Sequence, residues 1–359
     1  MYTFINMSTA TTIRSYMHVK VKVDNVKQTM VRAAIVTGVA GQDGSYLADF
    51  LLEKGYTVYG LTRFSSHQKK TPDHENFHLV RGDVTDPVCV SSLVKTVTSN
   101  QTWTRIEVYN LAAQSQVHVS FEQPEWTTRV DALGVLNILE AIRQCQDDRV
   151  RFYQAGTSEM FGKVLETPQK ESTPFYPRSP YGCAKVYGYW ITKNYREAHK
   201  LYACTGILFN HESERRGEEF VTRKITKAIG KGEFPIRLGN IDAKRDWGYA
   251  PDYVRGMWMM LQLDQPDDYV VSSGENHSVR EFVEKAFVCI GRTIVWDEQD
   301  TGTDAETGQV LVVRDPAFYR PTEVDVLIGD SSKFRTVSGW TQSVTFDELV
   351  RRMVQFDKV

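Results

Sequence analysis

Short runs rich in apolar and β-branched or aromatic residues recur through the first part of the chain, at residues 33–37, 57–61, 79–84, 107–111, 151–155 and 204–209. Between these runs, apolar residues recur every three or four positions, as at Tyr46, Leu47, Phe50 and Leu51. Continuous apolar runs are typical of strands buried on both faces, and the periodic stretches are typical of helices that cover such strands. The pattern predicts an α/β fold with a Rossmann-type doubly wound parallel sheet.

The pattern changes after residue 209, where longer loops replace the regular alternation. Two helices in this part are still indicated by capping boxes, which are Ser278 with Glu281 and Thr345 with Glu348. We therefore expect a first domain at 31–209 and a smaller C-terminal α/β domain at 210–359, parts of which return to the first. Residues 1–30 have no unbroken apolar segment and are predicted to be a disordered extension or the product of an upstream start codon.

Composition narrows the class of protein. The 359 residues are 41% apolar, which is enough for about two buried cores. The 43 Lys and Arg nearly cancel the 45 Asp and Glu, so no global field would gather nucleic acid or an anionic membrane. No apolar run approaches the ~20 residues of a membrane span. Five cysteines, with no Cys-x-x-Cys pair, fit buried thiols in a reducing compartment, and we expect a cytoplasmic protein.

A glycine-rich turn follows the first predicted strand. It comprises Gly38, Gly41, Gln42, Asp43 and Gly44 in a G-x-x-G-x-x-G spacing, rather than G-x-G-x-x-G. Bare backbone lets a pyrophosphate approach closely, and the phosphate charge then meets the N-terminus of the next helix. Because the turn lies between a predicted strand and a predicted helix, it indicates a dinucleotide site.

The ends of the next two strands bear on the choice of dinucleotide. NAD-specific enzymes usually place a carboxylate after the second strand, where this chain has Arg63. A guanidinium suits the 2′-phosphate of NADP, although Arg63 on its own could also be a solvated surface charge. The third predicted strand, 79–84, ends at Asp83 and Val84, and this carboxylate could hold the adenine amine. We therefore expect NADP as the cofactor.

The segment from His74 to His78 matches the zinc-protease pattern His-Glu-x-x-His. That chemistry requires both imidazoles on one face of a helix. Here Pro72-Asp73 precedes the motif and a β-type run begins within it, so no metal is expected.

Acid–base chemistry is indicated by Tyr181 and Lys185, which share one face of a helix opened by Pro180. A lysine cation and a nicotinamide cation favour the phenolate, so this tyrosine could take a proton from a sugar hydroxyl. An ordinary amphipathic helix is the alternative for this pair alone. The fifth strand, however, delivers Thr157 and Glu159 to the same edge of the sheet, where ligands of doubly wound folds bind.

Two further sets of residues extend the predicted site. The fourth strand, 107–111, leads to Ala112, Ala113, Gln114 and Ser115, among which small side chains could let a nicotinamide ribose lie against the backbone. Basic residues are dispersed through the second half and could converge on a diphosphate, namely Arg223, Lys224, Lys244, Arg245 and Arg320.

Taken together, these motifs resemble the GDP-mannose 4,6-dehydratase family within the extended short-chain dehydrogenase/reductases. The likeness runs from Val31 to about Trp340. The stretches that carry it are Gly41-Gln42-Asp43-Gly44-Ser45-Tyr46-Leu47, Thr157-Ser158-Glu159-Met160-Phe161-Gly162, Gly239-Asn240-Ile241-Asp242-Ala243-Lys244-Arg245-Asp246-Trp247-Gly248-Tyr249-Ala250 and Tyr319-Arg320-Pro321-Thr322-Glu323-Val324-Asp325. The resemblance implies conversion of GDP-mannose to GDP-4-keto-6-deoxymannose, a first step towards GDP-deoxyhexoses such as GDP-fucose or GDP-rhamnose. It also implies NADP that is reduced and reoxidised within each turnover, in a homodimer or homotetramer.

The resemblance assigns roles to individual positions. The implied catalytic residues are Thr157, Glu159, Tyr181 and Lys185. The implied cofactor-binding residues are Gly38, Gly41, Gln42, Asp43, Gly44, Arg63, Ser65, Ser66, Asp83, Val84, Leu111, Ala112, Ala113, Gln114, Ser115, Trp126, Lys185, His211 and Arg216. The implied substrate-binding residues are Ser115, Asn210, Lys224, Arg245, Arg320 and Glu323. The chain departs from the usual family residues at Ala40, Phe64, Gln116 and Trp126, none of which is a catalytic position.

Three related activities remain as alternatives. A UDP-hexose 4-epimerase shares the fold and the Tyr/Lys pair but needs no base for C5, so Glu159 favours dehydration. Other NDP-hexose 4,6-dehydratases, such as those acting on dTDP-glucose, carry an Asp-Glu pair where this chain has Thr157-Ser158-Glu159. A non-catalytic NADP-binding regulator would be expected to have lost catalytic residues that are present here.

Overall fold

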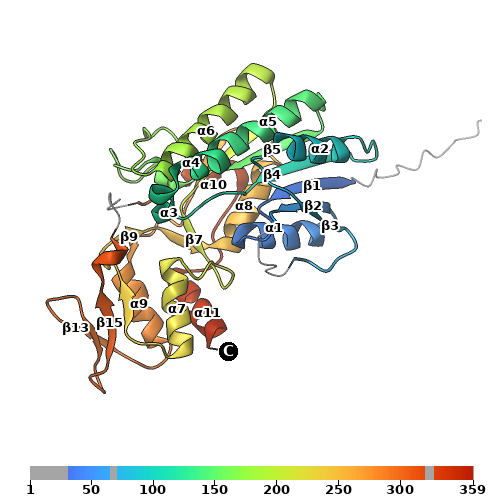
Figure 1. Ribbon diagram of the computed structural model, residues 1–359. Helices are drawn as coiled ribbons and strands as arrows, with labels where there is room; N and C mark the ends of the chain where they lie inside the picture. Colours follow the sequence, from blue (N-terminus) through green and yellow to red (C-terminus); the bar gives the residue numbers. More distant parts are fainter. Residues whose placement is uncertain (1–30, 65–70, 320–326, 359) are drawn as a thin grey trace, which may run out of the picture. The chain divides into compact units, whose positions relative to one another are not determined.

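The computed structural model describes residues 31–64, 71–319 and 327–358, and their arrangement is shown in Figure 1. The extension expected at 1–30 lies outside the described residues. A seven-stranded sheet, all of whose pairings are parallel, lies at the centre in the order β11-β6-β5-β4-β1-β2-β3. Its strands are β1 (Arg32–Thr37), β2 (Thr57–Thr62), β3 (Phe77–Arg81), β4 (Arg105–Asn110), β5 (Val150–Ala155), β6 (Tyr202–Leu208) and β11 (Asp268–Val271). The predicted doubly wound parallel sheet is confirmed.

Helices cover both faces of this sheet (Figure 1). One face packs against α1 (Gln42–Glu53), α8 (Ala250–Met260) and α10 (Ser332–Ser338), and the other against α2 (Pro87–Thr98), α5 (Gly134–Cys145) and α6 (Pro180–His199). Successive residues of a strand point to opposite faces. In β1, Ala34 and Val36 join the α1 side while Ala33 and Ile35 join the α2 side, and all four are buried. This two-sided burial explains why the predicted strands are continuous apolar runs.

The later part of the chain forms a second region with its own sheet and core. A four-stranded sheet has the order β13-β14-β15-β8, and its strands are β8 (Ile236–Leu238), β13 (Ile294–Trp296), β14 (Gly302–Asp304) and β15 (Val310–Arg314). A separate core lies between it and three helices, α7 (Val221–Lys231), α9 (Val279–Val288) and α11 (Phe346–Asp357). Phe282, Leu349 and Ile225 are fully buried there. Because β11 lies beyond residue 210 and joins the central sheet, the chain returns to its first core after entering the second.

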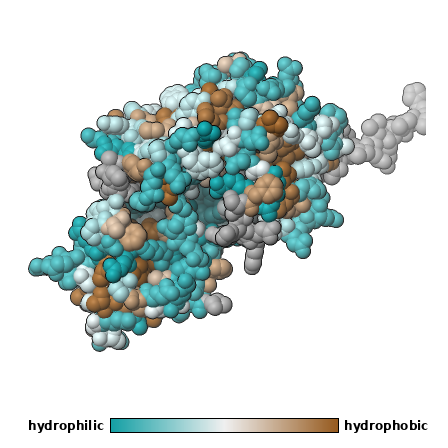
Figure 2. Space-filling model, in the orientation of Figure 1, coloured by the Kyte–Doolittle hydropathy of each residue, from teal (hydrophilic) through white to brown (hydrophobic). Residues whose placement is uncertain are grey.

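Shorter elements complete the fold. They are α3 (Val117–Glu122), α4 (Pro124–Thr128), the π-helical turn η1 (Arg129–Leu133), the 3₁₀ turns η2 (Ser158–Met160) and η3 (Pro316–Phe318), and the strand pairs β7 (Asn210–Glu212) with β10 (Trp247–Tyr249) and β9 (Lys244–Arg245) with β12 (His277–Ser278). Hydrophilic side chains cover most of the face shown in Figure 2. Within the described ranges, no helix has the length and apolar character needed to cross a bilayer.

Local sequence signals explain several element boundaries. The hydroxyls of Ser278 and Thr345 accept hydrogen bonds from the backbone N–H groups of Glu281 and Glu348, at 3.0 and 3.3 Å, so both predicted helix starts are confirmed. The third strand is shorter than predicted, because β3 ends at Arg81 and a turn follows.

Two other expectations can be compared with the structure directly. His74 precedes a turn and His78 lies in β3, so the two imidazoles do not share a helical face. All five cysteines are free thiols, but only Cys204 is buried and Cys183 is exposed. The expectation of buried thiols is therefore met fully only by Cys204, since Cys89, Cys145 and Cys289 pack against the cores while still partly exposed, and Cys183 is exposed.

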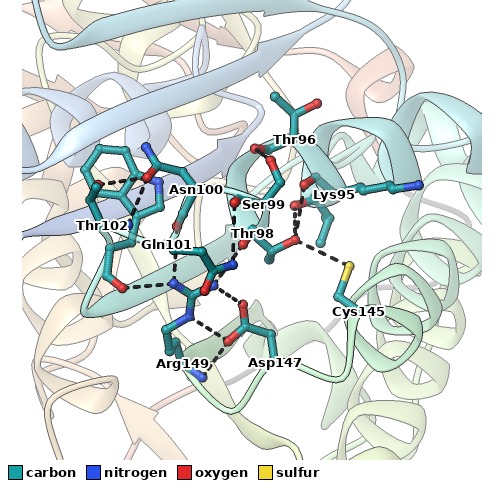
Figure 3. A network of polar contacts seen from close by, with 12 residues as sticks. Lys95, Thr96, Thr98, Ser99, Asn100, Gln101, Thr102, Cys145, Asp147 and Arg149 are labelled. Carbon is teal, nitrogen blue, oxygen red and sulfur yellow. Dashed lines mark hydrogen bonds and ion pairs between the residues drawn. The ribbon is translucent and has the colours of Figure 1, made fainter.

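A polar network holds together the end of the sheet opposite to the strands' carboxyl ends (Figure 3). Arg149 lies at its centre and forms a bidentate pair with Asp147, at 2.9 and 2.6 Å. The same guanidinium donates to the backbone carbonyls of Thr98, Asn100 and Trp103, at 2.8, 3.2 and 3.0 Å. It therefore ties the loop after α2 to the loop after α5, in a geometry that suits the planar fork of arginine.

We expect Arg149→Gln to lower the free energy of unfolding by about 2–3 kcal/mol, because a hydrogen bond to a charged group contributes roughly 1.5–3 kcal/mol and partly buried carbonyls lose their donor. Urea unfolding measures the change. The matched control is Arg143→Gln, which removes a pair with Glu140 in which the arginine side chain is 41% exposed. That change should cost no more than ~1 kcal/mol, and equal losses for the two variants would contradict a special role of Arg149.

Candidate active site

A cleft of about 730 Å³ lies beyond the carboxyl ends of β1, β2, β4, β5 and β6. The strand order changes direction between β1 and β4, and ligands of doubly wound sheets bind at such a switch point. Most of the predicted site residues line this one cleft. They are Gly38, Gly41, Gln42, Asp43, Gly44, Arg63, Asp83, Val84, Leu111, Ala112, Ala113, Gln114, Ser115, Trp126, Thr157, Glu159, Tyr181, Lys185, Asn210, His211 and Arg216.

The glycine-rich turn forms the floor of the cleft. Gly38 has a φ of +68°, which L side chains rarely adopt, and a Cβ on Gly44 would stand 2.3 Å from the Gly38 carbonyl oxygen. Gly41 precedes α1 and supplies no side-chain cap, so first-turn N–H groups of the helix are available at the cleft. This bare, electropositive helix start fits the diphosphate of a dinucleotide.

An ion pair fixes this turn to β7. His211 Nε2 lies 2.8 Å from Asp43 Oδ2, and its Nδ1 lies 2.7 Å from the Phe209 carbonyl oxygen. Burial lowers the pKa of His211, but the Asp43 carboxylate and the Phe209 carbonyl outweigh burial and the pKa is raised. Burial likewise raises the pKa of Asp43, but His211 outweighs it and that pKa is lowered. Both shifts favour the charged pair, which holds the strand after β6 against the start of α1.

Tyr181 and Lys185 lie one turn apart in the first half of α6, whose start is capped by Ser179 through a 3.0 Å hydrogen bond from the Gly182 N–H. Tyr181 is 8% exposed and Lys185 is 4% exposed. The Lys185 ammonium lies 5.7 Å from the centre of the Tyr181 ring and donates to the Ala155 carbonyl oxygen at 3.2 Å. The side chain of Thr157 lies near enough to Tyr181 to lower the pKa of the phenol. Tyrosine, lysine and threonine therefore meet at the end of β5.

The pKa of Tyr181 is raised in the protein alone. Burial is the largest cause, and the nearby carboxylates of Asp131 and Glu159 act in the same direction, while the neighbouring Thr157 side chain opposes them. Burial also lowers the pKa of Lys185, against the pull of Asp131. The side chains alone thus do not bring the tyrosine towards neutrality, and the additional positive charge of an oxidised nicotinamide would be needed to favour the phenolate.

Glu159 lies in η2, directly after the end of β5. Its backbone N–H donates to Thr157 Oγ1 at 3.2 Å, so Thr157 is the N-cap of this short turn. The cap fixes the position of the Glu159 backbone. The residue is 9% exposed and lines the cleft with Tyr181. The carboxylate and the phenol therefore approach the same space from β5 and α6, which suits two proton transfers on one bound sugar.

The structure separates some of the predicted substrate-binding residues from this cleft. Ser115 and Asn210 line it, whereas Lys224 and Arg245 lie outside its wall. Lys224 donates to the Arg237 carbonyl oxygen at 2.7 Å and lies over the Phe318 ring. Arg245 is buried and donates to the Lys244 carbonyl oxygen at 2.8 Å. The predicted residues Ser65, Ser66, Arg320 and Glu323 lie outside the described residues.

The cleft lining includes residues that were not predicted from the sequence, and two of them are polar or aromatic side chains from the second half of the chain. Glu219 and Phe220 stand in the loop before α7 and contribute to the cleft wall. Gln116 Nε2 donates to Glu219 Oε1 at 3.0 Å, which joins the segment after β4 to the segment after β7 across the cleft. Neither residue belongs to a recognisable motif, so only the three-dimensional fold could have indicated them.

Comparisons with known proteins identify the family of this chain. The family described as "GDP-mannose 4,6 dehydratase" matches residues 35–353. The chain belongs to the GDP-mannose 4,6-dehydratase family. Among members of this family, the GDP-mannose 4,6 dehydratase of Drosophila melanogaster is 54% identical over 346 residues, covering 91% of this chain and 86% of the relative. The one of Cricetulus griseus is 53% identical over 345 residues, covering 91% of each chain.

Solved structures show that the dehydratase fold is shared more widely. The UDP-glucose 4-epimerase of Thermus thermophilus, in complex with NAD, superimposes with a TM-score of 0.76 at 25% identity, covering 90% of this chain and 98% of that chain. Because an epimerase shares the same architecture, the fold alone does not select dehydration. The difference between an epimerase and a dehydratase must therefore come from the residues that line the cleft.

Proposed function

We propose that this chain converts GDP-mannose to GDP-4-keto-6-deoxymannose and water, with NADP held at the glycine-rich turn. The observation that carries the proposal is that Tyr181, Thr157 and Glu159 meet in one cleft, in a chain of the GDP-mannose 4,6-dehydratase family. We further infer that residues 31–209 hold the cofactor and residues 210–359 hold most of the sugar nucleotide.

Several residues would hold the dinucleotide. The turn from Gly38 to Gly44 and the start of α1 suit its diphosphate, the segment Leu111–Ser115 suits the nicotinamide ribose, and Arg63 suits a 2′-phosphate. When bound, the nicotinamide supplies an acceptor for the hydride of sugar C4 and a donor for C6 within the same turnover.

Tyr181 is proposed as the base of the first half-reaction. It takes the proton of the C4 hydroxyl as C4 becomes a ketone, and Thr157, which lines the same cleft, is proposed to donate to the same oxygen. The positive charge of Lys185 favours the phenolate form that accepts this proton. Without the ketone, the C5 proton is not acidic and hydroxide at C6 is a poor leaving group, so oxidation has to come first.

Glu159 is proposed as the base of the second half-reaction. Once C4 is a ketone, the adjacent C5–H is acidic and the carboxylate can remove its proton. Delivery of that proton to the C6 hydroxyl lets water leave. The proton collected by Tyr181 is then available for C5 when C6 is reduced, so two protons are taken from the sugar and two are returned. The sugar product of the two half-reactions has a ketone at C4 and a methyl group at C6.

Product analysis tests the proposal. Incubation of the protein with GDP-mannose should yield an alkali-sensitive 4-keto-6-deoxy sugar nucleotide, identified by mass spectrometry. Parallel incubations use UDP-glucose, for epimerisation, and dTDP-glucose, for the other dehydration. Turnover of either of these in preference to GDP-mannose, or of none of the three, would overturn the proposal.

The NADP preference rests on Arg63, whose guanidinium lies 5.9 Å from the centre of the Trp126 ring at the cleft. We expect Arg63→Asp to weaken the binding of NADP by roughly 10–100-fold, which corresponds to the loss of one charge-assisted hydrogen bond. The affinity for NAD should change little. Arg63→Lys keeps the charge without the fork and should give an intermediate loss for NADP. Calorimetric titration with each dinucleotide measures both constants, and equal losses for NADP and NAD would show that Arg63 does not contact the 2′-phosphate.

A homodimer or homotetramer in the cytoplasm is also proposed, on the resemblance to the family. Sedimentation velocity at micromolar concentration measures the assembly. A single species of monomer mass, with or without NADP, would contradict it.

A further inference from the structure

Asp131 is a buried carboxylate beside the site to which no role has been assigned above. It stands in the π-helical turn η1, between α4 and α5, and is 1% exposed. Single π-helical turns inside helices are frequent at functional sites. Here the turn packs against α6, where a Cβ on Gly188 would come within 3.4 Å of the Asp131 carbonyl oxygen. A small residue on α6 therefore lets η1 approach the helix that carries Tyr181 and Lys185.

The two oxygens of this carboxylate are used differently. Oδ1 accepts a hydrogen bond from the Gln114 backbone N–H at 2.9 Å, which fixes the segment Leu111–Ser115 along the cleft wall. Oδ2 has no hydrogen-bond partner among the described residues, although it is fully buried. An unpaired buried charge is costly, and an asparagine could accept the same Gln114 hydrogen bond without that cost. Support of the cleft wall alone therefore does not account for an aspartate.

The charges that face Asp131 come from α6. Lys185 and Tyr181 both interact electrostatically with it, and the only hydrogen bond that the described residues offer the Lys185 ammonium is the one to Ala155. Ionisable groups on the neighbouring elements are paired elsewhere and are at least partly exposed: His118 with Glu122 on α3, Arg129 with Glu125 from α4, and Glu140 with Arg143 on α5. The carboxylate is thus directed at the catalytic pair.

We propose that Asp131 is a positioning residue of the reaction, whose carboxylate keeps the Lys185 ammonium charged and in place beside Tyr181 while holding the cleft wall through Gln114. The inference rests on the proposed function for its kinetic readout. It assigns to η1 a role in setting the pH range in which Tyr181 and Lys185 have the required charges.

The direction of the pH effect follows from elementary electrostatics. Burial raises the pKa of Asp131 to about 7, with Lys185 acting in the opposite direction. A negative charge at this position raises the pKa of Lys185 and that of Tyr181. Its removal should therefore lower both. The acid limb of the pH–rate profile, which reports formation of the phenolate, and the alkaline limb, which reports loss of the ammonium, should move in the same direction.

The test is the pH dependence of kcat for Asp131→Asn, which keeps the acceptor for Gln114 and removes the charge. We expect both limbs to move to lower pH by about one unit, the usual size of a neighbouring-charge effect. Asp131→Glu retains the charge and should keep both limbs within ~0.3 units of the wild-type values, whatever its kcat. Glu140→Gln, which neutralises a partly exposed carboxylate on α5 outside the cleft lining, should leave the profile unchanged. A lower kcat for Asp131→Asn with both limbs in place, or limbs displaced in Asp131→Glu, would overturn the proposal.

A second readout needs no sugar and keeps the inference separate from the proposed function. Binding of the oxidised dinucleotide, whose nicotinamide ring is cationic, favours the phenolate, so protons are released, and calorimetry in buffers of different ionisation enthalpy counts them. The pH at which this release is half complete should fall by about one unit in Asp131→Asn. If GDP-mannose is not turned over by the wild type but this shift is seen, the proposed substrate is wrong and the role of Asp131 stands. If the midpoint does not move, the role of Asp131 is wrong.

Discussion

Replacement of Tyr181 by phenylalanine is expected to reduce turnover of GDP-mannose by at least ~100-fold, because general acid–base catalysis contributes ~10²–10⁴-fold and the phenol is the proposed acceptor of the first proton. The change removes one oxygen and keeps the ring that packs in α6, so the fold and dinucleotide binding should be nearly unaffected. Stopped-flow absorbance with excess enzyme should show no reduced dinucleotide after GDP-mannose is added.

The control for this variant is Tyr189→Phe. Tyr189 lies two turns further along α6, is also buried, and packs edge-on against Phe175, outside the residues that line the cleft. It should retain most of the activity. Retention of more than about a hundredth of wild-type activity in Tyr181→Phe would mean that another group accepts the first proton.

Replacement of Glu159 by glutamine is expected to separate the two halves of the reaction. Glutamine has nearly the same size and still offers an oxygen for hydrogen bonding, but it cannot take the C5 proton. Tyr181, Lys185 and Thr157 remain in place, so C4 can still be oxidised. A single turnover should accumulate reduced dinucleotide, seen by absorbance, while mass spectrometry of the sugar nucleotide finds no 6-deoxy product.

Substrate carrying deuterium at C5 gives the matching result in the wild type. Loss of water should slow, while the first appearance of reduced dinucleotide should keep its rate, because the C5–H bond is broken only in the second half. Product formation by Glu159→Gln at near wild-type rate would remove this residue from the mechanism. Failure of the variant to reduce the dinucleotide at all would instead assign Glu159 to the first half.

The central sheet and the floor of the site could be predicted because they depend on local patterns. Strands buried on both faces must be continuous apolar runs, and a helix start that meets a phosphate needs bare backbone, as at Gly38 and Gly44. Helix starts capped by Ser278 and Thr345 could be predicted for the same reason. The ends of strands could be predicted less accurately. Gly82 and Asp83 were predicted to belong to the third strand, but they follow the end of β3.

Contacts between distant segments could not be predicted in this way. The bond between Gln116 and Glu219 joins residues 103 positions apart, and Glu219 belongs to no motif. Lys224 remains a predicted substrate-binding residue, and the sequence does not indicate that its ammonium donates to the Arg237 carbonyl oxygen and lies over the Phe318 ring. The same limit applies to Asp131, whose importance depends on burial beside α6 rather than on any spacing in the sequence.

The raised pKa of Tyr181 shows a further limit of spacing arguments. Tyr181 and Lys185 do share one face of α6, as their separation predicts. Burial, which a sequence motif does not indicate, nevertheless has the largest effect on the pKa of the Tyr181 phenol and raises it. The pattern therefore identified the pair, whereas the charge state of the pair depends on its surroundings.

The fate of the hydrogen on C4 tests the central claim most directly. GDP-mannose carrying deuterium at C4 is incubated with the wild-type protein, and the product is examined by NMR and mass spectrometry. If this chain catalyses the proposed dehydration, the deuterium is found in the C6 methyl group of a 4-keto product, and water has been lost. Deuterium returned to C4 of an epimerised hexose with its C6 hydroxyl intact, or lost to solvent, would contradict the account.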